Sequence, residues 1–355
     1  MCALQDSRGF WTDFRQFAGG STEWITGYVG NMLLATMNLR KVAPFSLDTV
    51  ILKAADWLVS AQHPGGGWGW NEAIPVDVDS TSTCLLFLHS TTTSDRFIKC
   101  LANSLSHVVG NQDSGNSGFA TFSLTDIQSA RSRQSCAFGF PLRLLQPFVA
   151  KIYSGWCSPE PYVTAVTAHF LITVDKRQYS ERVVRALDYI EGEQTRHGCW
   201  NSYWCNGQTF VTAACIRSLS ADDSREEAIQ KAMNWILKEQ KGNGAWECKA
   251  LGKITPLETA SAILGLLIKT PNVDHAKICE GINYLLGVQR SDGSWESQPC
   301  MSVPQPWESK DFTQEEYKHP RLVVTDDGRI FTTATVLRAL LRCLELADPL
   351  EIRDL

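Results

Sequence analysis

The chain has 355 residues, of which 44% are hydrophobic, so it is long enough to bury a large apolar core. Its net charge of -5 argues against nucleic acid as the main partner, because phosphate backbones are bound by basic surfaces. No segment approaches the roughly 20 apolar residues of a membrane span, and the N-terminus is charged where a signal peptide is apolar.

The first predicted element is a repeated amphipathic helix that ends near a glutamine and is followed by glycine and tryptophan. It starts with a basic and a small residue, and an aromatic-aliphatic pair precedes the glutamine by four residues. The glycine is a helix stop signal, and we expect the tryptophan to pack just beyond it. A degenerate copy is expected near Phe97–Val109, and four full or nearly full copies span Lys53–Trp68, Arg185–Trp200, Lys231–Trp246 and Glu280–Trp295.

A second helix type alternates with the first and begins around a threonine that precedes a small residue. The basic period is near 48 residues, and it is stretched by insertions near 110–155 and 297–327. Both insertions are rich in Ser, Pro and Gly, so we expect them to be loops between hairpins. The six threonines are Thr26, Thr81, Thr164, Thr212, Thr259 and Thr333.

Two alternating helix types with short connections predict stacked αα-hairpins. The Thr/Ala-rich helices suit a crowded inner ring, and the helices with a charged face suit an outer ring. We therefore predict one all-α domain over residues 1–355, an (α/α)6 barrel of six inner and about six outer helices. The alternative is an open solenoid, which should carry polar capping repeats that the sequence does not show.

One column of the second repeat contains an acidic outlier. Two residues before the threonine, five of the six copies have a large aromatic or apolar residue, and the sixth has Asp79. Four residues before the threonine all six copies are polar, as helix N-terminal positions require, and Asp77 fits that pattern. The five large members of the first column are Trp24, Tyr162, Phe210, Leu257 and Phe331.

The Gln-x-x-x-Gly-x-Trp units resemble the QW repeats of squalene-hopene and oxidosqualene cyclases. The segment Pro75–Thr81 (PVDVDST) resembles the Asp-x-Asp-Asp-Thr motif of squalene-hopene cyclases and other class II terpene cyclases. The resemblance covers most of the chain from Lys53 onward and implies an α/α-barrel. It implies that Asp79 donates the proton and that Asp77 supports it, while Ser80 replaces the third acid, which oxidosqualene cyclases also lack.

The resemblance implies a cyclase that protonates an alkene of a prenyl-derived or other hydrophobic polyene inside the barrel, without a metal or other cofactor. Aromatic rings beside the acid would stabilise the carbocation, and Arg329 could pair with Asp77 or bind an anionic substrate head. Squalene-type cyclases use two barrels, whereas this chain has residues for one. A peripheral membrane contact or a partner protein could therefore cover the mouth of the barrel. The rings expected to bind the substrate are Trp24, Tyr162, Phe210 and Phe331.

Two other functions stay open from the sequence. A prenyltransferase-like barrel would hold an isoprenyl diphosphate with zinc or magnesium, and a lipid-binding or scaffold barrel would bind a ligand without converting it. Two further motifs have simpler explanations. Asp222–Glu226 resembles the metal-binding motif of class I terpene synthases, but a helix N-cap followed by first-turn acids explains it. His197, Cys199 and Cys205 could bind zinc only with a fourth ligand, which the sequence does not show.

The chain contains 12 cysteines, several of which lie within apolar helical patterns. Buried free thiols in a reducing compartment explain this placement better than a disulfide framework. We therefore expect a cytoplasmic protein with reduced thiols at Cys84, Cys215, Cys279 and Cys343.

Overall fold

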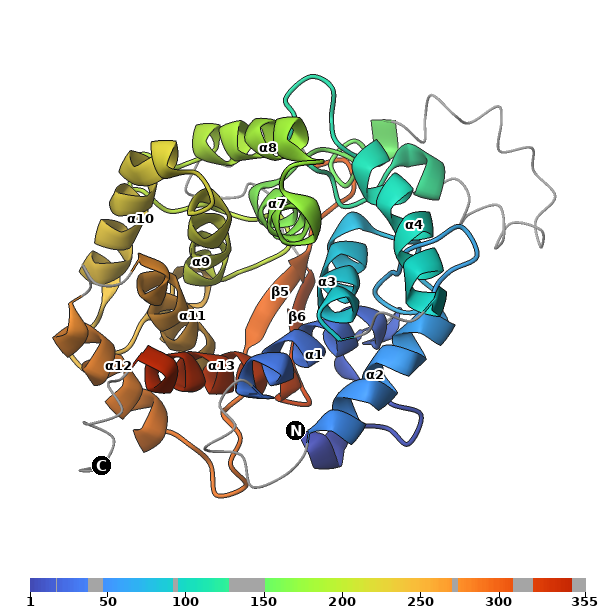
Figure 1. Cartoon of the computed structure of the whole chain (residues 1–355). Helices are drawn as coiled ribbons and strands as arrows, with labels where there is room; N and C mark the ends of the chain where they lie inside the picture. Colours follow the sequence, from blue (N-terminus) through green and yellow to red (C-terminus); the bar gives the residue numbers. More distant parts are fainter. Residues whose placement is uncertain are drawn as a thin grey trace.

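The computed structural model describes residues 1–16, 18–37, 47–91, 95–127, 151–269, 274–308 and 322–346. Its helices form two concentric rings (Figure 1). The inner ring contains α1 (Glu23–Met37), α3 (Val78–His89), α7 (Pro161–Asp175), α9 (Gln208–Leu219), α11 (Pro256–Leu266) and α13 (Ile330–Leu346). The outer ring contains α2 (Asp48–Ala61), α4 (Asp95–Gly110), α8 (Ser180–Gly192), α10 (Glu226–Glu239) and α12 (His275–Gly287).

The inner ring is closed, because α13 packs against α1 just as each inner helix packs against its neighbour. The structure thus confirms the predicted barrel and excludes the open solenoid. Small residues allow this crowding: a Cβ atom at Gly30 of α1 would lie 2.6 Å from the ring of Phe87 in α3. Because neighbouring backbones approach so closely, the sequence of the inner helices favours Gly, Ala, Ser and Thr at the contacts.

The tryptophans of the repeat connect the inner and outer rings. The indole Nε1 of Trp200 donates to the carbonyl of Ile190 at 2.6 Å, and its backbone N–H donates to the hydroxyl of Thr212 at 3.2 Å. The same pair of bonds recurs in the other copies, always to a carbonyl ten residues earlier and to the repeat threonine. These tryptophans are buried structural residues, as expected, and the other three are Trp68, Trp246 and Trp295.

The glutamines of the repeat connect successive outer helices. Gln194 Nε2 donates to the carbonyl of Ala228 in α10 at 2.9 Å, and Gln240 Nε2 donates to Lys277 in α12 at 2.8 Å. Gln62 makes the equivalent bond to Cys100 in α4 at 2.8 Å. These partly buried bonds are made to carbonyls in the first half of the next outer helix, so each glutamine fixes the end of one outer helix against the following one.

Two further copies of this arrangement are present. Gln5 donates to Val50 in α2 at 2.8 Å, and Trp11 Nε1 donates to Met1, ten residues earlier, at 3.1 Å. This unit follows the 3-10 helix η1 (Cys2–Leu4) and has the same Gln-Gly-Trp spacing as the other copies. Gln112 follows the predicted degenerate helix and donates to Arg182 in α8 at 2.9 Å.

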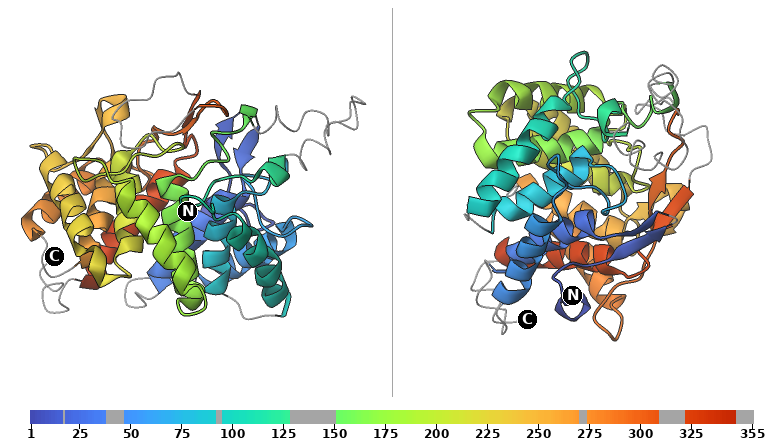
Figure 2. Two further views of the ribbon diagram at one scale, coloured as in Figure 1. Left: turned by 90° about the horizontal axis from the view of Figure 1, so that it is seen from above. Right: turned by 90° about the vertical axis from the view of Figure 1, so that its right-hand side faces the viewer.

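All six inner helices begin at the same end of the barrel, and a strand pair crosses that end (Figures 1 and 2). The strands β5 (Pro299–Val303) and β6 (Leu322–Thr325) are antiparallel and fall within the insertion that we predicted to be a loop. They form because alternate residues of β5 turn inward, so that Cys300 and Ser302 are buried. Two shorter strand pairs were also not predicted: β1 (Asp13–Gln16) with β2 (Gly19–Ser21), and β3 (Glu247–Cys248) with β4 (Lys253–Ile254).

Parts of the predicted insertions, residues 128–150 and 309–321, lie outside the described residues. Two of the cysteines expected to be buried, Cys84 and Cys215, are buried free thiols, whereas Cys279 is exposed because it lies on the outer face of α12. Within the described ranges, every helix is too short or too polar to cross a membrane.

Candidate active site at the closed end of the barrel

The inner ring encloses a cavity of about 430 Å³, which is in the usual range for small-molecule sites. Because the six inner helices are aligned on their threonines, equivalent positions form levels along the lumen. The level two residues before the threonine lies next to β5, and it contains Trp24, Asp79, Tyr162, Phe210, Leu257 and Phe331. The next level, two residues after the threonine, lines the cavity with Tyr28, Thr83, Val166, Ala214, Ser261 and Thr335.

Asp79 lies in the first turn of α3, one turn from the cavity-lining Thr83. Part of the residue is accessible, but its Oδ1 atom is buried and has no partner at ordinary hydrogen-bond geometry among the described residues. The indole Nε1 of Trp24 is likewise buried, and Trp24 and Thr83 are the donors that act on the Asp79 carboxyl group. A buried carboxyl oxygen that is so weakly bonded is unusual in a folded interior, and active sites are where such groups gather.

The surroundings of Asp79 favour its protonated form. Burial raises the pKa of Asp79 well above its usual value, and the nearby carboxyl groups of Asp77 and Glu160 raise it further. Trp24 and Thr83 act in the opposite direction but do not outweigh burial. A carboxyl group that keeps its proton in an apolar cavity is the state that a general acid requires.

Asp77 has a different role in the same segment. It is the N-cap of α3: its Oδ1 accepts the backbone N–H of Ser80 at 2.6 Å, and its Oδ2 accepts the Ser80 hydroxyl at 2.8 Å. Burial raises the pKa of Asp77 to about 7, although both bonds to Ser80 oppose the rise. Ser80, which replaces the third acid of the motif, therefore fixes the carboxyl group that stands beside Asp79.

The structure brings the four predicted aromatic residues together near Asp79. Trp24 and Phe331 have ring centroids 5.5 Å apart, Phe331 and Phe210 are 5.4 Å apart, and Phe210 and Tyr162 are 5.3 Å apart. Tyr162 and Phe210 also line the cavity. Ring faces in a water-poor site attract a cation, each by roughly 0.5–2 kcal/mol, so this level can stabilise positive charge beside the acid.

Arg329 does not belong to this group. Its guanidinium forms a salt bridge with Asp292 at 3.0 Å, and the side chains of both residues are partly exposed to solvent. It precedes α13 with a positive φ of 58°, in a turn closed by a bond from its N–H to Asp326, which directs the side chain away from the lumen. The expected pairing with Asp77 is absent because Asp77 bonds to Ser80.

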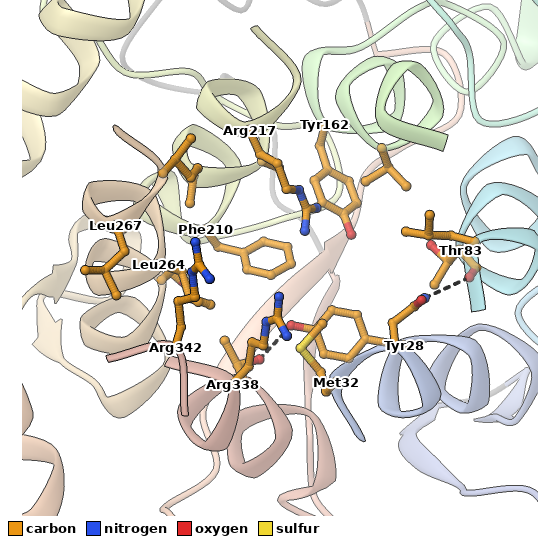
Figure 3. Close-up of a pocket in the computed structure, with 18 residues that line it drawn as sticks. Tyr28, Met32, Thr83, Tyr162, Phe210, Arg217, Leu264, Leu267, Arg338 and Arg342 are labelled. Carbon is orange, nitrogen blue, oxygen red and sulfur yellow. Dashed lines mark hydrogen bonds between the residues drawn. The ribbon is translucent and has the colours of Figure 1, made fainter. Parts of the chain in front are cut away.

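The cavity contains cationic residues that our sequence analysis missed. Arg217, Arg338 and Arg342 line it, and Figure 3 shows their guanidinium groups turned toward its centre. When the six inner helices are aligned, Arg217 and Arg338 fall at the same position, five residues after the repeat threonine. Across the six helices that position contains Asn31, Leu86, His169, Arg217, Leu264 and Arg338.

The two metal motifs considered from the sequence have structural roles. Asp222 caps the 3-10 helix η3 (Asp223–Arg225) by accepting the N–H of Ser224, and it pairs with Arg225 at 3.2 Å. His197, Cys199 and Cys205 line a surface hollow formed by the loop that joins α8 to α9, by α10 and by the segment around Lys249. Within the described residues, no cluster of three or more His, Cys, Asp or Glu side chains is arranged to hold a metal ion.

Comparisons with known proteins agree with this arrangement. A family model described as the squalene-hopene cyclase C-terminal domain matches residues 70–308, more than half of the chain. A probable squalene-hopene cyclase of Sinorhizobium fredii is 26% identical over 263 residues, which cover 68% of this chain and 38% of that protein. The chain thus spans less than half the length of the curated squalene-hopene cyclases that it matches.

Among solved structures, the type II terpene cyclase MstE from Scytonema without ligand is similar over almost the whole chain. The TM-score is 0.76 at 24% identity, and the match covers 98% of this chain and 96% of that one. A variant of MstE in complex with geranylgeranyl dihydroxybenzoate, its substrate, matches with a TM-score of 0.75 at 25% identity and covers 98% and 95% of the two chains.

Proposed function

Because this chain belongs to the family of the squalene-hopene cyclase C-terminal domain, we propose that it is a class II terpene cyclase that protonates and cyclises a prenyl-derived polyene inside its single barrel. The observation that carries the proposal is Asp79, a carboxyl group with a buried oxygen and a raised pKa that stands one turn from the cavity-lining Thr83, at the level of the aromatic rings. MstE, which this chain matches over its whole length, supports a complete site within one barrel.

The reaction begins when the Asp79 carboxyl group gives its proton to one carbon of an alkene. The alkene electron pair forms the new C–H bond, and the other carbon becomes a cation. The electron pair of the next alkene attacks that cation, which forms a C–C bond and moves the charge along the chain. Loss of a proton to water ends the sequence, so the product is an isomer of the substrate and nothing is oxidised or reduced.

The closed end of the barrel contributes by excluding water. Strands β5 and β6 cover the side of the aromatic level away from the cavity, and Cys300 and Met301 of β5 lie against Trp24 and Phe331 there. A dry aromatic environment stabilises the cation without supplying a nucleophile that would trap it early. The substrate must then enter from the other end of the ring, where the inner helices finish.

A turnover experiment tests the proposal. Purified protein is incubated with geranylgeraniol, geranylgeranyl diphosphate, geranylgeranyl dihydroxybenzoate or squalene, and products are analysed by mass spectrometry. We expect an isomeric product with fewer alkenes from at least one compound. Asp79→Asn should lower its rate of formation by roughly 10²–10⁴-fold, the usual contribution of a general acid.

The matched control is Asp292→Asn, which removes a carboxylate on the exterior and should leave the rate unchanged. Thermal unfolding verifies that each variant is folded. Conversion at the wild-type rate by Asp79→Asn would refute the role of Asp79. Binding without conversion of any of the four compounds would favour the lipid-binding alternative.

A further inference from the structure

The arginines of the cavity stand at a fixed distance from the aromatic level. Arg217 follows Phe210 by seven residues in α9, and Arg338 follows Phe331 by seven residues in α13. Seven residues are nearly two helical turns, about 10 Å along the helix axis. Each arginine therefore leaves the same face of its helix as the corresponding ring, nearly two turns further along the lumen from the level of Asp79. Figure 3 shows both guanidinium groups within the lining of the cavity.

The charges of these arginines have little compensation among the described residues, where Glu345 acts on Arg338 only at a distance. Neither Arg217 nor Arg338 forms an ion pair with any carboxylate in the described part of the chain, whereas Arg342 pairs with Glu345 at 2.8 Å. Burial lowers the pKa of both Arg217 and Arg338, but a guanidinium keeps its proton at neutral pH. Cations held in a largely apolar cavity are costly unless an anion compensates them.

A purely structural explanation covers only part of this cluster. Arg217 lies in the last turn of α9, where a cation interacts favourably with the helix dipole. Arg338 lies in the middle of α13, far from either end of that helix, and no such interaction is available to it. Moreover, both guanidinium groups point into the cavity. An interaction with the helix dipole alone would not require the side chain to point into the lumen.

His169 of α7 stands at the equivalent position of its helix, five residues after the repeat threonine. Burial lowers the pKa of His169 to about 3, and the charges of Arg217 and Arg338 contribute to the shift. Two cations at one end of a cavity are groups that recognise an oxyanion.

We propose that Arg217 and Arg338 bind the anionic head group of the substrate, a carboxylate or a phosphate. The chain then lies tail first, with its distal alkene at Asp79 and its head at the open end. This orientation rests on the proposed function, whereas the recognition of the anion does not. A pure hydrocarbon would leave both arginines uncompensated and is not the substrate class that this cavity suits.

Equilibrium binding tests the inference without turnover. The probes are farnesol, farnesoic acid and farnesyl phosphate, which share one chain and differ in the head group, and quenching of tryptophan fluorescence reports binding. We expect both anions to bind at least tenfold more tightly than farnesol. Arg217→Gln and Arg338→Gln should each reduce this preference to less than threefold while leaving farnesol affinity within about twofold.

Arg329→Gln is the matched control, because it removes an arginine on the exterior and should keep the full preference. Arg217→Lys covers the case in which the glutamine variant does not fold, and it should retain part of the preference. A marked preference for one of the two anions would identify the head as carboxylate or phosphate. Equal binding of farnesol and the anions, or an unchanged preference in both glutamine variants, would overturn the inference.

The experiment separates this inference from the proposed function. Asp79→Asn should keep the tenfold preference for anions, since it changes the end of the cavity that holds the chain's tail. An anion preference in a protein that converts no substrate would leave the inference intact and refute the cyclase. Conversion of substrates at rates that do not depend on the head group would support the cyclase and refute the recognition of an anion.

Discussion

Asp77 and Asp79 differ in how their carboxyl groups are bonded, although only two residues separate them. Both oxygens of Asp77 accept bonds from Ser80, whereas Oδ1 of Asp79 has no partner at ordinary hydrogen-bond geometry within the described residues, and only Trp24 and Thr83 act on that carboxyl group as donors. The first carboxyl group is thus fixed in the helix cap, and the second is the more weakly bonded of the two. Because the two groups interact, each proton loss belongs in part to the pair.

This coupling gives a pH prediction for Asp77→Asn. An asparagine can keep the cap of α3, so the variant should fold. It lacks the charge that raises the pKa of Asp79, so that pKa falls. The rate requires protonated Asp79, and its decline at high pH should therefore begin at lower pH, by about one unit. The test is to measure kcat of wild type and Asp77→Asn from pH 5 to pH 9. A decline at the same pH in both proteins would contradict the coupling.

Single residues could be predicted from the sequence wherever the repeats supplied a comparison. Asp79 stood out because five equivalent positions hold large apolar residues. Arg217 and Arg338 have the same kind of signal, but recognising it requires the helix register to be followed two turns further into the lumen. Arg329 was misplaced because its direction depends on a turn with positive φ that sequence spacing does not reveal.

At the scale of secondary-structure elements, the glutamine of each repeat determines how outer helices join. Gln240 donates to Gly244 in its own loop and to Lys277 in α12, at 2.9 and 2.8 Å. Gln289 makes the loop bond to Gly293 at 3.1 Å but has no bond to a further outer helix within the described residues. Comparing the two glutamines therefore separates the contribution of the loop bond to stability from that of the bond to the next outer helix.

We predict that Gln240→Ala lowers the free energy of unfolding by about 1–3 kcal/mol, because two partly buried hydrogen bonds, one to the loop and one to α12, are lost. Gln289→Ala, the matched control, should cost less than about 1 kcal/mol, since its single bond is exposed to water. Urea unfolding of both variants measures the difference. An equal decrease in the free energy of unfolding in both variants would show that the bond between Gln240 and α12 does not contribute to stability.

The elements themselves could be predicted where the repeat was regular. The unit Gln5–Trp11 escaped because only η1 precedes it, so the helical periodicity that marks the other copies is missing. The pair β5–β6 escaped because its two strands lie far apart in the chain and pair across the end of the barrel. Pairing of this kind is not visible in the composition of the segment, which predicted only a loop.

At the scale of the whole molecule, the lumen is polarised from end to end. The N-termini of the inner helices and the covering strands lie at one end (Figures 1 and 2), where Asp77 and Asp79 begin α3, and the arginines line the cavity further along the lumen. The closed ring that creates this axis could be predicted from the repeats. Its polarity could not, because it depends on which way each inner helix points relative to the covering strands.

The buried acid at the closed end should cost the protein stability. The pKa of Asp79 is raised in the folded state, so the folded protein binds this proton more tightly than the unfolded chain does. Its contribution to stability is therefore most favourable below the unfolded pKa, near 4, and is lost as pH rises toward the folded pKa. At neutral pH an uncharged replacement should fold more readily than wild type, as is common for catalytic groups.

We therefore predict that Asp79→Asn gains stability over wild type as pH rises. Between pH 5 and pH 7.5 the gain in the free energy of unfolding should grow by up to about 3 kcal/mol, the limit for one proton over that interval. Urea unfolding of both proteins at the two pH values measures it. Asp292→Asn should show no such growth, because the pKa of that exposed carboxyl is lowered and it is ionised in both states. If the two variants responded alike, Asp79 would not be the buried, proton-holding group that the proposed chemistry requires.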